Sequence, residues 1–405
     1  MRITFILLII LNANLLFAFQ AKPYDFPKKV DTTTKEIFKQ ERRTFQLQNG
    51  VVFDNTFKSA NMGKLMEEDT SYLIDVLPEN RPINYSPWYA FKVWAAKDTV
   101  VQVVMDYGEY KYGQRYWPKL SSDGVNWKKL SKSSFTKIDS SKVSFTLNLS
   151  KVPLWVSAQE IQNSDMVNQW IQSQIGLEGA IYKTIGQTNL GRDIPLIEYV
   201  VGKKKPTIIV LSRQHPPEVT GYLAMKSFIE RIFDVKDELS AEFLSNFNLL
   251  VFPLMNPDGV DLGHWRHNAG GVDLNRDWAY YNQPETRQVA DYIVSFAAEK
   301  KSDVVLGLDF HSTWRDIYYT NVDSLESALP KFTNDWITNI KARIEDSEAK
   351  VSASGIGQPV SKGWFYTQFK ATGITYEIGD NTPRDLIKLK GEVSAEEMMK
   401  LLLKK

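Results

Sequence analysis

Ile208-Ile-Val-Leu-Ser-Arg-Gln-His-Pro-Pro-Glu218 decides the fold of this chain, because an apolar strand ends in a histidine and a glutamate three positions apart. Strands that are apolar at every position are buried on both faces, which is typical of a parallel sheet covered by helices. In open α/β sheets, ligands bind beyond the carboxyl ends of the strands. His215 and Glu218 therefore stand where half of a metal site is expected.

Two further apolar strands repeat this design: residues 304–310 lead to His311, and residues 374–376 lead to Glu377. Two imidazoles and one carboxylate suit zinc, which takes three protein ligands in catalytic sites and leaves one position for water or substrate. We predict a single zinc ion on His215, Glu218 and His311. Glu377 is the expected general base, which takes a proton from water and later gives it to a leaving amine.

A second group of polar residues lies in a Gly-rich stretch. Asn256-Pro-Asp-Gly259 follows another apolar strand, and Arg266-His-Asn-Ala-Gly-Gly-Val-Asp-Leu-Asn-Arg276 comes soon after. Guanidinium groups bind carboxylates through two hydrogen bonds and stabilise oxyanions. An ordinary turn with solvated arginines is the alternative. His264 and His267 flank Arg266 without further ligands, so we expect them in the loop or at the rim.

The pattern divides the chain into two predicted domains. Over residues 45–157, short strands of alternating polarity lie between turn signals such as Asn49-Gly50 and Pro78-Glu-Asn-Arg-Pro82, which favours an antiparallel β-sandwich. Over residues 158–405, apolar strands alternate with helices, which favours an α/β domain. The expected helices cover residues 161–175, 220–233, 284–298, 330–344 and 393–403. All four histidines lie in the second domain.

Residues 1–18 have the pattern of an export signal, because Arg2 precedes a mostly apolar stretch that ends at Ala18. We expect this segment to be removed and the protein to lie in the periplasm or outside the cell. A membrane anchor is the alternative, but Asn12 and Asn14 interrupt a stretch shorter than the roughly 20 residues of a span. Residues 19–44 are polar and are predicted to form a flexible leader.

Composition excludes several classes of function. The chain has no cysteine, which rules out disulfides, thiolate metal sites and a cysteine nucleophile. Its net charge is +1 over 405 residues, without the basic excess of a nucleic-acid binder. No segment after residue 18 is long and apolar enough to cross a membrane. The oligomeric state is not predicted.

The ordered motifs resemble those of zinc carboxypeptidases of the carboxypeptidase A clan. They are His215-Pro-Pro-Glu218, Asn256-Pro-Asp-Gly259, Gly271-Val-Asp-Leu-Asn-Arg276, Asp309-Phe-His-Ser312 and Thr375-Tyr-Glu-Ile378. Phe57-Lys-Ser-Ala-Asn61 and Gly113-Gln-Arg-Tyr-Trp-Pro118 resemble the N-terminal domain of the cytosolic carboxypeptidase-like subfamily. The resemblance covers about residue 45 to the C-terminus. It implies a mixed, mostly parallel eight-stranded sheet flanked by helices. Together with the export signal and the absence of cysteine, it indicates an exported bacterial member of this subfamily.

The resemblance also implies an activity, the zinc-dependent hydrolysis of the C-terminal peptide bond of peptides or proteins. By motif, Arg266 would polarise the scissile carbonyl, and Asn275 and Arg276 would hold the terminal carboxylate of the substrate. Asp273 falls where the family has a carboxylate that orients the first zinc histidine. Its alternative role is a loop cap.

This sequence departs from the family in the loop that usually carries the substrate-binding tyrosine and reads the terminal side chain, and no specificity residue is identified in it. The substrate-binding tyrosine of the family usually lies on a mobile loop, and residues 350–357, the comparable stretch here, contain none. Tyr366 is nearer Glu377 and is expected to be structural. Of the eleven tryptophans, Trp265, Trp314 and Trp364 are candidates to line the cleft.

Two other functions remain open at this point. A zinc amidase or isopeptidase that acts on murein fragments or γ-linked acidic peptides would keep the metal chemistry and change the substrate. A peptide-binding protein without activity belongs to another class, and the joint presence of the three metal ligands and Glu377 argues against it.

Overall fold

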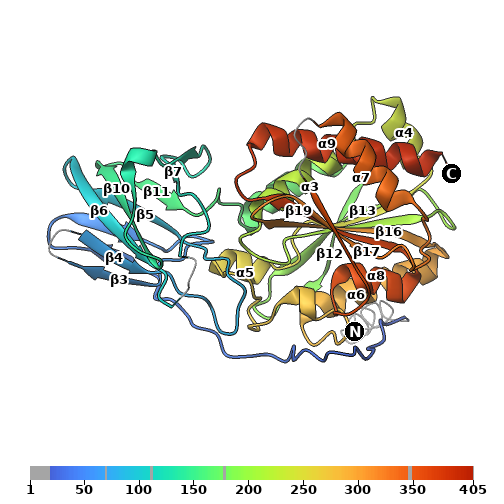
Figure 1. The fold of residues 1–405 in the computed structure, drawn as a ribbon, viewed down its shortest axis with the longest axis horizontal. Helices are drawn as coiled ribbons and strands as arrows, with labels where there is room; N and C mark the ends of the chain where they lie inside the picture. The colour runs from blue at the N-terminus through green and yellow to red at the C-terminus, as the bar shows by residue number, and fades with distance from the viewer. Residues whose placement is uncertain (1–18, 69–70, 110–112, 177–178, 345–348, 405) are drawn as a thin grey trace, which may run out of the picture.

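The fold is described from a computed structural model, over residues 19–68, 71–109, 113–176, 179–344 and 349–404. The expected export signal, residues 1–18, lies outside the described residues. A smaller domain of strands lies beside a larger domain in which helices cover a central sheet (Figure 1). The two share a boundary, because Val219 and Trp265 of the larger domain belong to the hydrophobic cluster of the smaller one.

The smaller domain consists of two sheets. One has the order β1 (Thr44–Gln46), β2 (Val51–Asp54), β5 (Ala90–Ala95), β11 (Leu154–Ser157), β7 (Lys119–Ser121) and β8 (Lys128–Lys129). The other has the order β3 (Lys64–Glu67), β4 (Ser71–Asp75), β6 (Thr99–Asp106), β10 (Lys142–Leu149) and β9 (Phe135–Lys137), with a 3-10 turn, η1, at Lys132–Ser134. Side chains from both sheets, such as Phe53, Val103 and Phe145, share one hydrophobic cluster.

The pairing within these sheets corrects one expectation. All pairs are antiparallel among the described strands except β4 and β6, which run parallel. The chain leaves β4, passes through β5 in the other sheet and returns as β6. Because β4 and β6 are not joined directly by a hairpin, they are free to pair in parallel, and the expectation of a wholly antiparallel domain is wrong at this pair.

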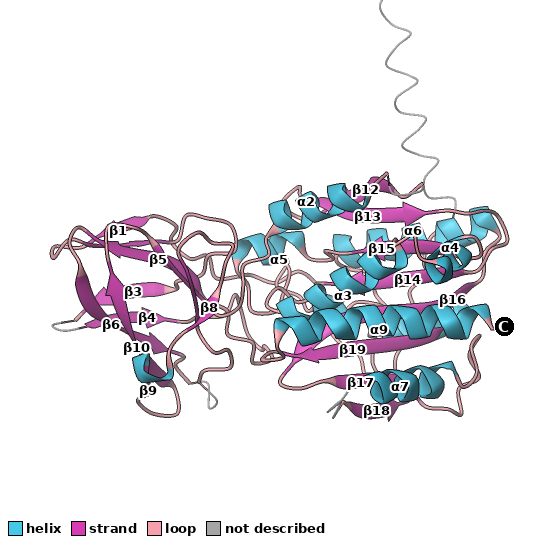
Figure 2. Cartoon of the chain, turned by 90° about the horizontal axis from the view of Figure 1, so that it is seen from above, coloured by secondary structure: helices cyan, strands magenta, loops and turns pink. Residues whose placement is uncertain are grey.

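The larger domain is built on an eight-stranded sheet. Its order is β12 (Ile181–Gln187), β13 (Asp193–Tyr199), β15 (Asn248–Phe252), β14 (Thr207–Ser212), β16 (Val304–Thr313), β19 (Thr372–Gly379), β17 (Ile317–Asn321) and β18 (Lys350–Ser354). The central strands β15, β14, β16 and β19 are parallel to one another. Antiparallel pairs join β13 to β15 and β17 to β19. Figure 2 shows the strands laid side by side in this order.

Helices cover both faces of this sheet. They are α2 (Ser164–Gln174), α3 (Val219–Ile232), α4 (Glu238–Leu244), α5 (Pro257–Leu262), α6 (Pro284–Lys300), α7 (Phe332–Arg343), α8 (Ser361–Phe369) and α9 (Arg384–Leu403), with a 3-10 turn, η2, at Leu274–Arg276. Because side chains alternate along a strand, Ile208 and Val210 of β14 pack toward α3 and α9, whereas Ile209 and Leu211 pack toward α6 and α8. Figure 1 shows α3, α7 and α9 above the sheet and α6 and α8 below it.

Residues 19–43 correct the expectation of a flexible leader. This extended segment crosses the α6 side of the larger domain and then reaches the smaller one (Figure 1). Ala21 and Phe26 are buried, the backbone N–H of Ala21 donates to Asp291 Oδ1 at 2.8 Å, and Thr32 Oγ1 donates to Asp277 Oδ1 at 2.5 Å. At these points the segment has buried partners in the larger domain, which composition alone does not reveal.

Two strands run further than the sequence predicts. His311 lies inside β16, and Glu377 lies inside β19, rather than just beyond the strand ends. The two residues are direct partners in the parallel pair, so they stand side by side near the carboxyl edge of the sheet. Within the described part of the chain, no helix has both the length and the apolar character needed to cross a bilayer.

Candidate active site

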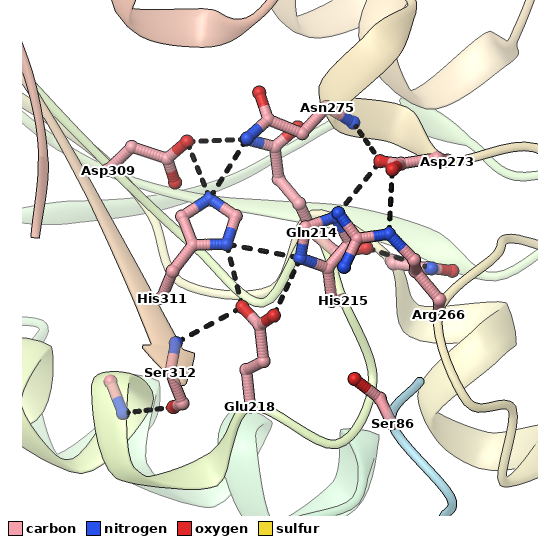
Figure 3. Close-up of polar contacts among 12 residues, drawn as sticks. Ser86, Gln214, His215, Glu218, Arg266, Asp273, Asn275, Asp309, His311 and Ser312 are labelled. Atoms are coloured by element: carbon pink, nitrogen blue, oxygen red, sulfur yellow. Dashed lines mark hydrogen bonds and ion pairs between the residues drawn. The ribbon is translucent and has the colours of Figure 1, made fainter. Parts of the chain in front are cut away.

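Neighbouring parallel strands bring the predicted metal ligands together. In the pair of β14 and β16, Ser212 stands opposite Phe310, so the loop after β14 carries His215 and Glu218 beside His311. All three side chains are buried, and their ligand atoms lie within 4.8 Å of one another. Figure 3 shows the three side chains converging, with Glu218 at the start of α3 and the histidines above it.

Both histidines turn the same ring nitrogen toward Glu218. Nδ1 of His215 lies 2.8 Å from Glu218 Oε1, Nδ1 of His311 lies 2.7 Å from Glu218 Oε2, and the two Nδ1 atoms are 3.2 Å apart. Burial acts to raise the pKa of the Glu218 carboxyl, but the two histidines hold this pKa well below its usual range. Two imidazole nitrogens and one carboxylate facing one point are a donor set that fits zinc.

Each histidine is held from behind by a carboxylate, which is part-buried Asp273 for His215 and fully buried Asp309 for His311 (Figure 3). Nε2 of His215 lies 2.9 Å from Asp273 Oδ1, and Nε2 of His311 lies 2.8 Å from Asp309 Oδ2. Such partners fix the ring orientation and the tautomer of a metal-binding histidine, so that the opposite nitrogen is free to bind. Asp273 contacts His215, as its predicted orienting role would require, and that role stays a prediction. Asp309 was missed by the sequence reasoning, although residues two apart on a strand share a face.

Glu377 stands beside the three predicted metal ligands and is not one of the converging set. Desolvation, followed by the negative charge of Glu218, raises the pKa of the Glu377 carboxyl above its usual range, while the charges of His311 and Arg115 act in the opposite direction. Its Oε2 atom has no hydrogen-bond partner among the described residues. A carboxyl group with a raised pKa and an uncommitted oxygen is suited to accept and return a proton.

The same cleft is lined by Arg266, Asn275 and Arg276, each held by different contacts. Nε of Arg266 donates to Asp273 Oδ2 at 2.7 Å, which joins this arginine to the carboxylate behind His215. Asn275 Oδ1 accepts from the backbone N–H of Ser361 at 3.0 Å, so only its amide nitrogen points toward His311, at 3.5 Å from Nε2. Arg276 Nη1 donates to the Asn275 carbonyl at 2.7 Å.

These residues line one cleft of about 990 Å³. The seven expected site residues in its wall are His215, Glu218, Arg266, Asn275, Arg276, His311 and Glu377. The smaller domain supplies part of the wall through Asn84, Tyr85, Ser86 and Arg115, which the sequence reasoning did not anticipate. The site is therefore built at the junction of the two domains.

Aromatic residues of the cleft differ from those expected. Trp314 lines the cleft and is 55% exposed, whereas Trp265 and Trp364 are fully buried in the packed interior. Tyr319 of β17 also lines the cleft, and burial followed by the negative charge of Glu377 raises the pKa of its hydroxyl. No sequence signal singled out this tyrosine, because β17 is short and lies between longer elements.

The two remaining histidines lie in the loop around Arg266. His264 Nδ1 is 3.0 Å from the backbone carbonyl of His267, and His267 Nδ1 is 2.5 Å from Asn80 Oδ1 in the smaller domain. Both are buried rather than at the rim.

Lys362 is a cation of the cleft that the sequence analysis did not name. It lies in the first turn of α8 and is 5% exposed. Its Nζ donates to Asn321 Oδ1 at 3.0 Å and to Ser354 Oγ at 3.1 Å, both neutral acceptors. Burial lowers the pKa of the Lys362 ammonium to about 8.

Known proteins resemble this chain in sequence or in fold. An uncharacterized protein of Zymomonas mobilis is 23% identical over 245 residues, 58% of this chain and 61% of that protein. Cytosolic carboxypeptidase 6 of Caenorhabditis elegans is 24% identical over 332 residues, 74% of this chain and 71% of that protein. The chain thus spans less than two thirds of the length of the Zymomonas protein. A metallo-carboxypeptidase crystal structure from Burkholderia cenocepacia matches with a TM-score of 0.74 and 17% identity, over 87% of this chain and 99% of that one.

The resemblance seen in the motifs is confirmed by a family comparison. The sequence profile described as zinc carboxypeptidase, peptidase M14, matches residues 178–392, more than half of the 405-residue chain. The matched part contains β12 to the first half of α9, and with it His215, Glu218 and His311, the three predicted metal ligands. The chain belongs to the zinc carboxypeptidase family.

Proposed function

We propose that this protein is a zinc-dependent metallocarboxypeptidase that removes the C-terminal residue of peptides or proteins. The observation that carries the proposal is the buried group of His215, Glu218 and His311, with ligand atoms within 4.8 Å, beside Glu377, whose Oε2 has no hydrogen-bond partner among the described residues. These three residues would hold one zinc ion, and Asp273 and Asp309 would keep the two imidazoles oriented. When bound, zinc polarises a carbonyl and lowers the pKa of water toward 7.

The proton steps fall to Glu377. Its raised pKa and free oxygen suit a group that takes a proton from the attacking water and then delivers it to the nitrogen of the departing residue. No other carboxyl group of the described residues lines the cleft apart from the metal ligand Glu218. Replacing Glu377 by glutamine should therefore remove turnover while the ligand group stays intact.

The arginines supply positive charge on the substrate side. Arg266 would stabilise the oxygen of the tetrahedral intermediate, and loss of one such donor lowers kcat by about 10² to 10³. Arg276 and the amide nitrogen of Asn275 would hold the terminal carboxylate of the substrate. The Asn275 side chain has one donor group left for this task, because its oxygen is already bound to the backbone of α8.

Lys362 favours an acidic terminal side chain. A buried ammonium is costly unless an anion compensates its charge, and the acceptors that Lys362 contacts are neutral. A carboxylate from the substrate, entering the same cleft, would provide that compensation. We therefore propose Glu or Asp as the preferred terminal residue.

An acidic preference keeps the alternative of γ-linked substrates open. A zinc isopeptidase acting on γ-linked acidic peptides or murein fragments would use the same metal, the same base and Lys362. It would differ in the direction that the substrate's backbone takes away from the scissile bond. Incubation of the zinc-loaded protein with matched α-linked and γ-linked peptides, followed by mass spectrometry, separates the two. Release of single residues from the α-linked peptides, blocked by a chelator, supports the proposal. Release from the γ-linked peptides alone, or no release at all, contradicts it.

The remaining proposals concern the whole chain. We propose that residues 1–18 direct export to the periplasm or the cell exterior, and that residues 45–157 and 158–405 form the β-sandwich and catalytic domains. Support comes from the pattern of Arg2, the apolar stretch and Ala18 in the sequence. N-terminal sequencing of the protein recovered from the periplasm of an expressing bacterium tests the export signal.

A further inference from the structure

The loop between β4 and β5 in the smaller domain contains a buried carboxylate, Glu79, whose side chain is 1% exposed. Its oxygens accept three consecutive backbone N–H groups of the larger domain. Oε2 accepts from Trp265 at 2.8 Å, and Oε1 accepts from Arg266 at 3.0 Å and from His267 at 2.6 Å. Three successive N–H groups aimed at one anion fix the peptide planes that they belong to.

The middle of these three residues is Arg266, the proposed oxyanion donor. From there a chain of contacts runs to the metal site: Arg266 Nε donates to Asp273 Oδ2 at 2.7 Å, and Asp273 Oδ1 lies 2.9 Å from His215 Nε2. The neighbouring Asn80 adds a second contact between the domains, because its Nδ2 donates to the Gly271 carbonyl at 2.9 Å. The loop that carries Arg266 is thus held by residues of the other domain.

We propose that Glu79 is a positioning residue for the reaction, which acts through the backbone of residues 265–267 to hold Arg266 in place. The smaller domain then contributes to catalysis indirectly, because the Glu79 carboxylate binds the backbone of the loop that carries Arg266. This inference rests on the proposed function. It goes beyond that proposal by assigning a role to a residue outside the part of the chain that matches the family.

Glu79→Gln is the informative variant. A carboxamide has nearly the same shape, but it presents one oxygen and one NH2 group, so at least one of the three N–H groups would face another donor. The loop should then relax, and a displacement of about 1 Å at a catalytic group lowers the rate by about 10². We expect kcat to fall about 100-fold with little change in KM. Glu67→Gln is the matched control, since Glu67 is an exposed glutamate of β3 in the same domain.

Three measurements decide the matter in the full-length, zinc-loaded protein. In hydrogen exchange, Glu79→Gln should speed the exchange of the 265–267 amides and leave those of β16 unchanged. In a double-mutant cycle, Glu79→Gln should change kcat less than about twofold once Arg266 is replaced by methionine, because coupled residues are not additive. Glu79→Asp, which keeps the charge but is shorter, should give an intermediate kcat.

The results that would overturn the inference are equally definite. They are faster exchange of these amides with an unchanged kcat, or losses from Glu79→Gln and Arg266→Met that simply multiply. If Glu79→Gln does not fold, the Glu79→Asp variant decides, and wild-type kcat in that variant contradicts the role. A wild-type protein that cleaves no peptide refutes the proposed function instead, which keeps the two failures distinct.

Discussion

Replacement of Asp309 by asparagine should weaken zinc binding without unfolding the protein. Asp309 is fully buried, and its Oδ2 accepts from Gln214 Nε2 at 2.6 Å and from Ser361 Oγ, and lies 2.8 Å from His311 Nε2. An asparagine oxygen can occupy the same place and keep these contacts, so the change removes the negative charge behind the ring. The other oxygen of Asp309, Oδ1, has no hydrogen-bond partner among the described residues. The NH2 group of an asparagine could therefore take the place of Oδ1 without breaking an existing hydrogen bond.

The size of the effect follows from the role of such partners. Loss of a carboxylate behind a metal-binding histidine lowers metal affinity by about 10-fold to 100-fold, which corresponds to about 1.4 to 2.7 kcal/mol. Competition with a chromogenic chelator measures the zinc dissociation constant, and circular dichroism of the metal-free variant checks the fold. Asp335→Asn, in the first turn of α7, is the matched control. A dissociation constant of Asp309→Asn within twofold of wild type would refute the reasoning.

Three further outcomes are expected. Glu377→Gln should retain zinc at the wild-type affinity and lose peptide hydrolysis, measured by chelator competition and mass spectrometry, and an active variant would remove Glu377 as the base. Lys362→Met should lower kcat/KM for peptides ending in Glu more than for those ending in Leu, and equal losses would exclude Lys362 as the specificity group. Burial raises the pKa of Glu285 to about 7 from 4.5, so its ionisation costs about 3 kcal/mol, at 1.36 kcal/mol per pH unit. Because this folded-state pKa is raised, wild type loses stability as pH rises from 4.5 through 7. In urea unfolding, the free energy of unfolding of Glu285→Gln should not show this loss between pH 4.5 and 7. If the variant and the wild type lose the same free energy over that range, the raised pKa of Glu285 is contradicted.

The central sheet and its ligand edge could be predicted because their signals are local. Continuous apolar runs identify β14, β16 and β19, and the carboxyl ends of parallel strands meet at one edge, so His215, His311 and Glu377 had to lie near one another. The shorter elements gave no such signal. Strands β17 and β18 and helix α8 have few apolar positions or no clear period, so Tyr319 and Lys362, which they carry, stayed unidentified.

Contacts across the domain boundary could not be read from the sequence for a different reason. Glu79 sits in a stretch whose prolines and asparagine indicate only a turn, and its partners lie 186 to 188 residues away. Arg115 is similar: its guanidinium is buried against Asp380, at 2.8 Å between Nε and Oδ2, but 265 positions separate the two. Helix α9 begins at Arg384 rather than near residue 393. Gly391 inside it is unfavourable for a helix by itself, and it is accommodated because it packs closely against the Ala224 carbonyl of α3.

The most direct test of the account is the metal content of the purified protein. Elemental analysis by mass spectrometry should find one zinc ion per chain in the wild type, and His311→Ala or Glu218→Ala should bring this value close to zero while the Glu377→Gln protein keeps it near one. A wild-type protein without bound zinc after incubation with the ion, or ligand variants that still hold one ion per chain, would contradict the claim that these three side chains form the metal site.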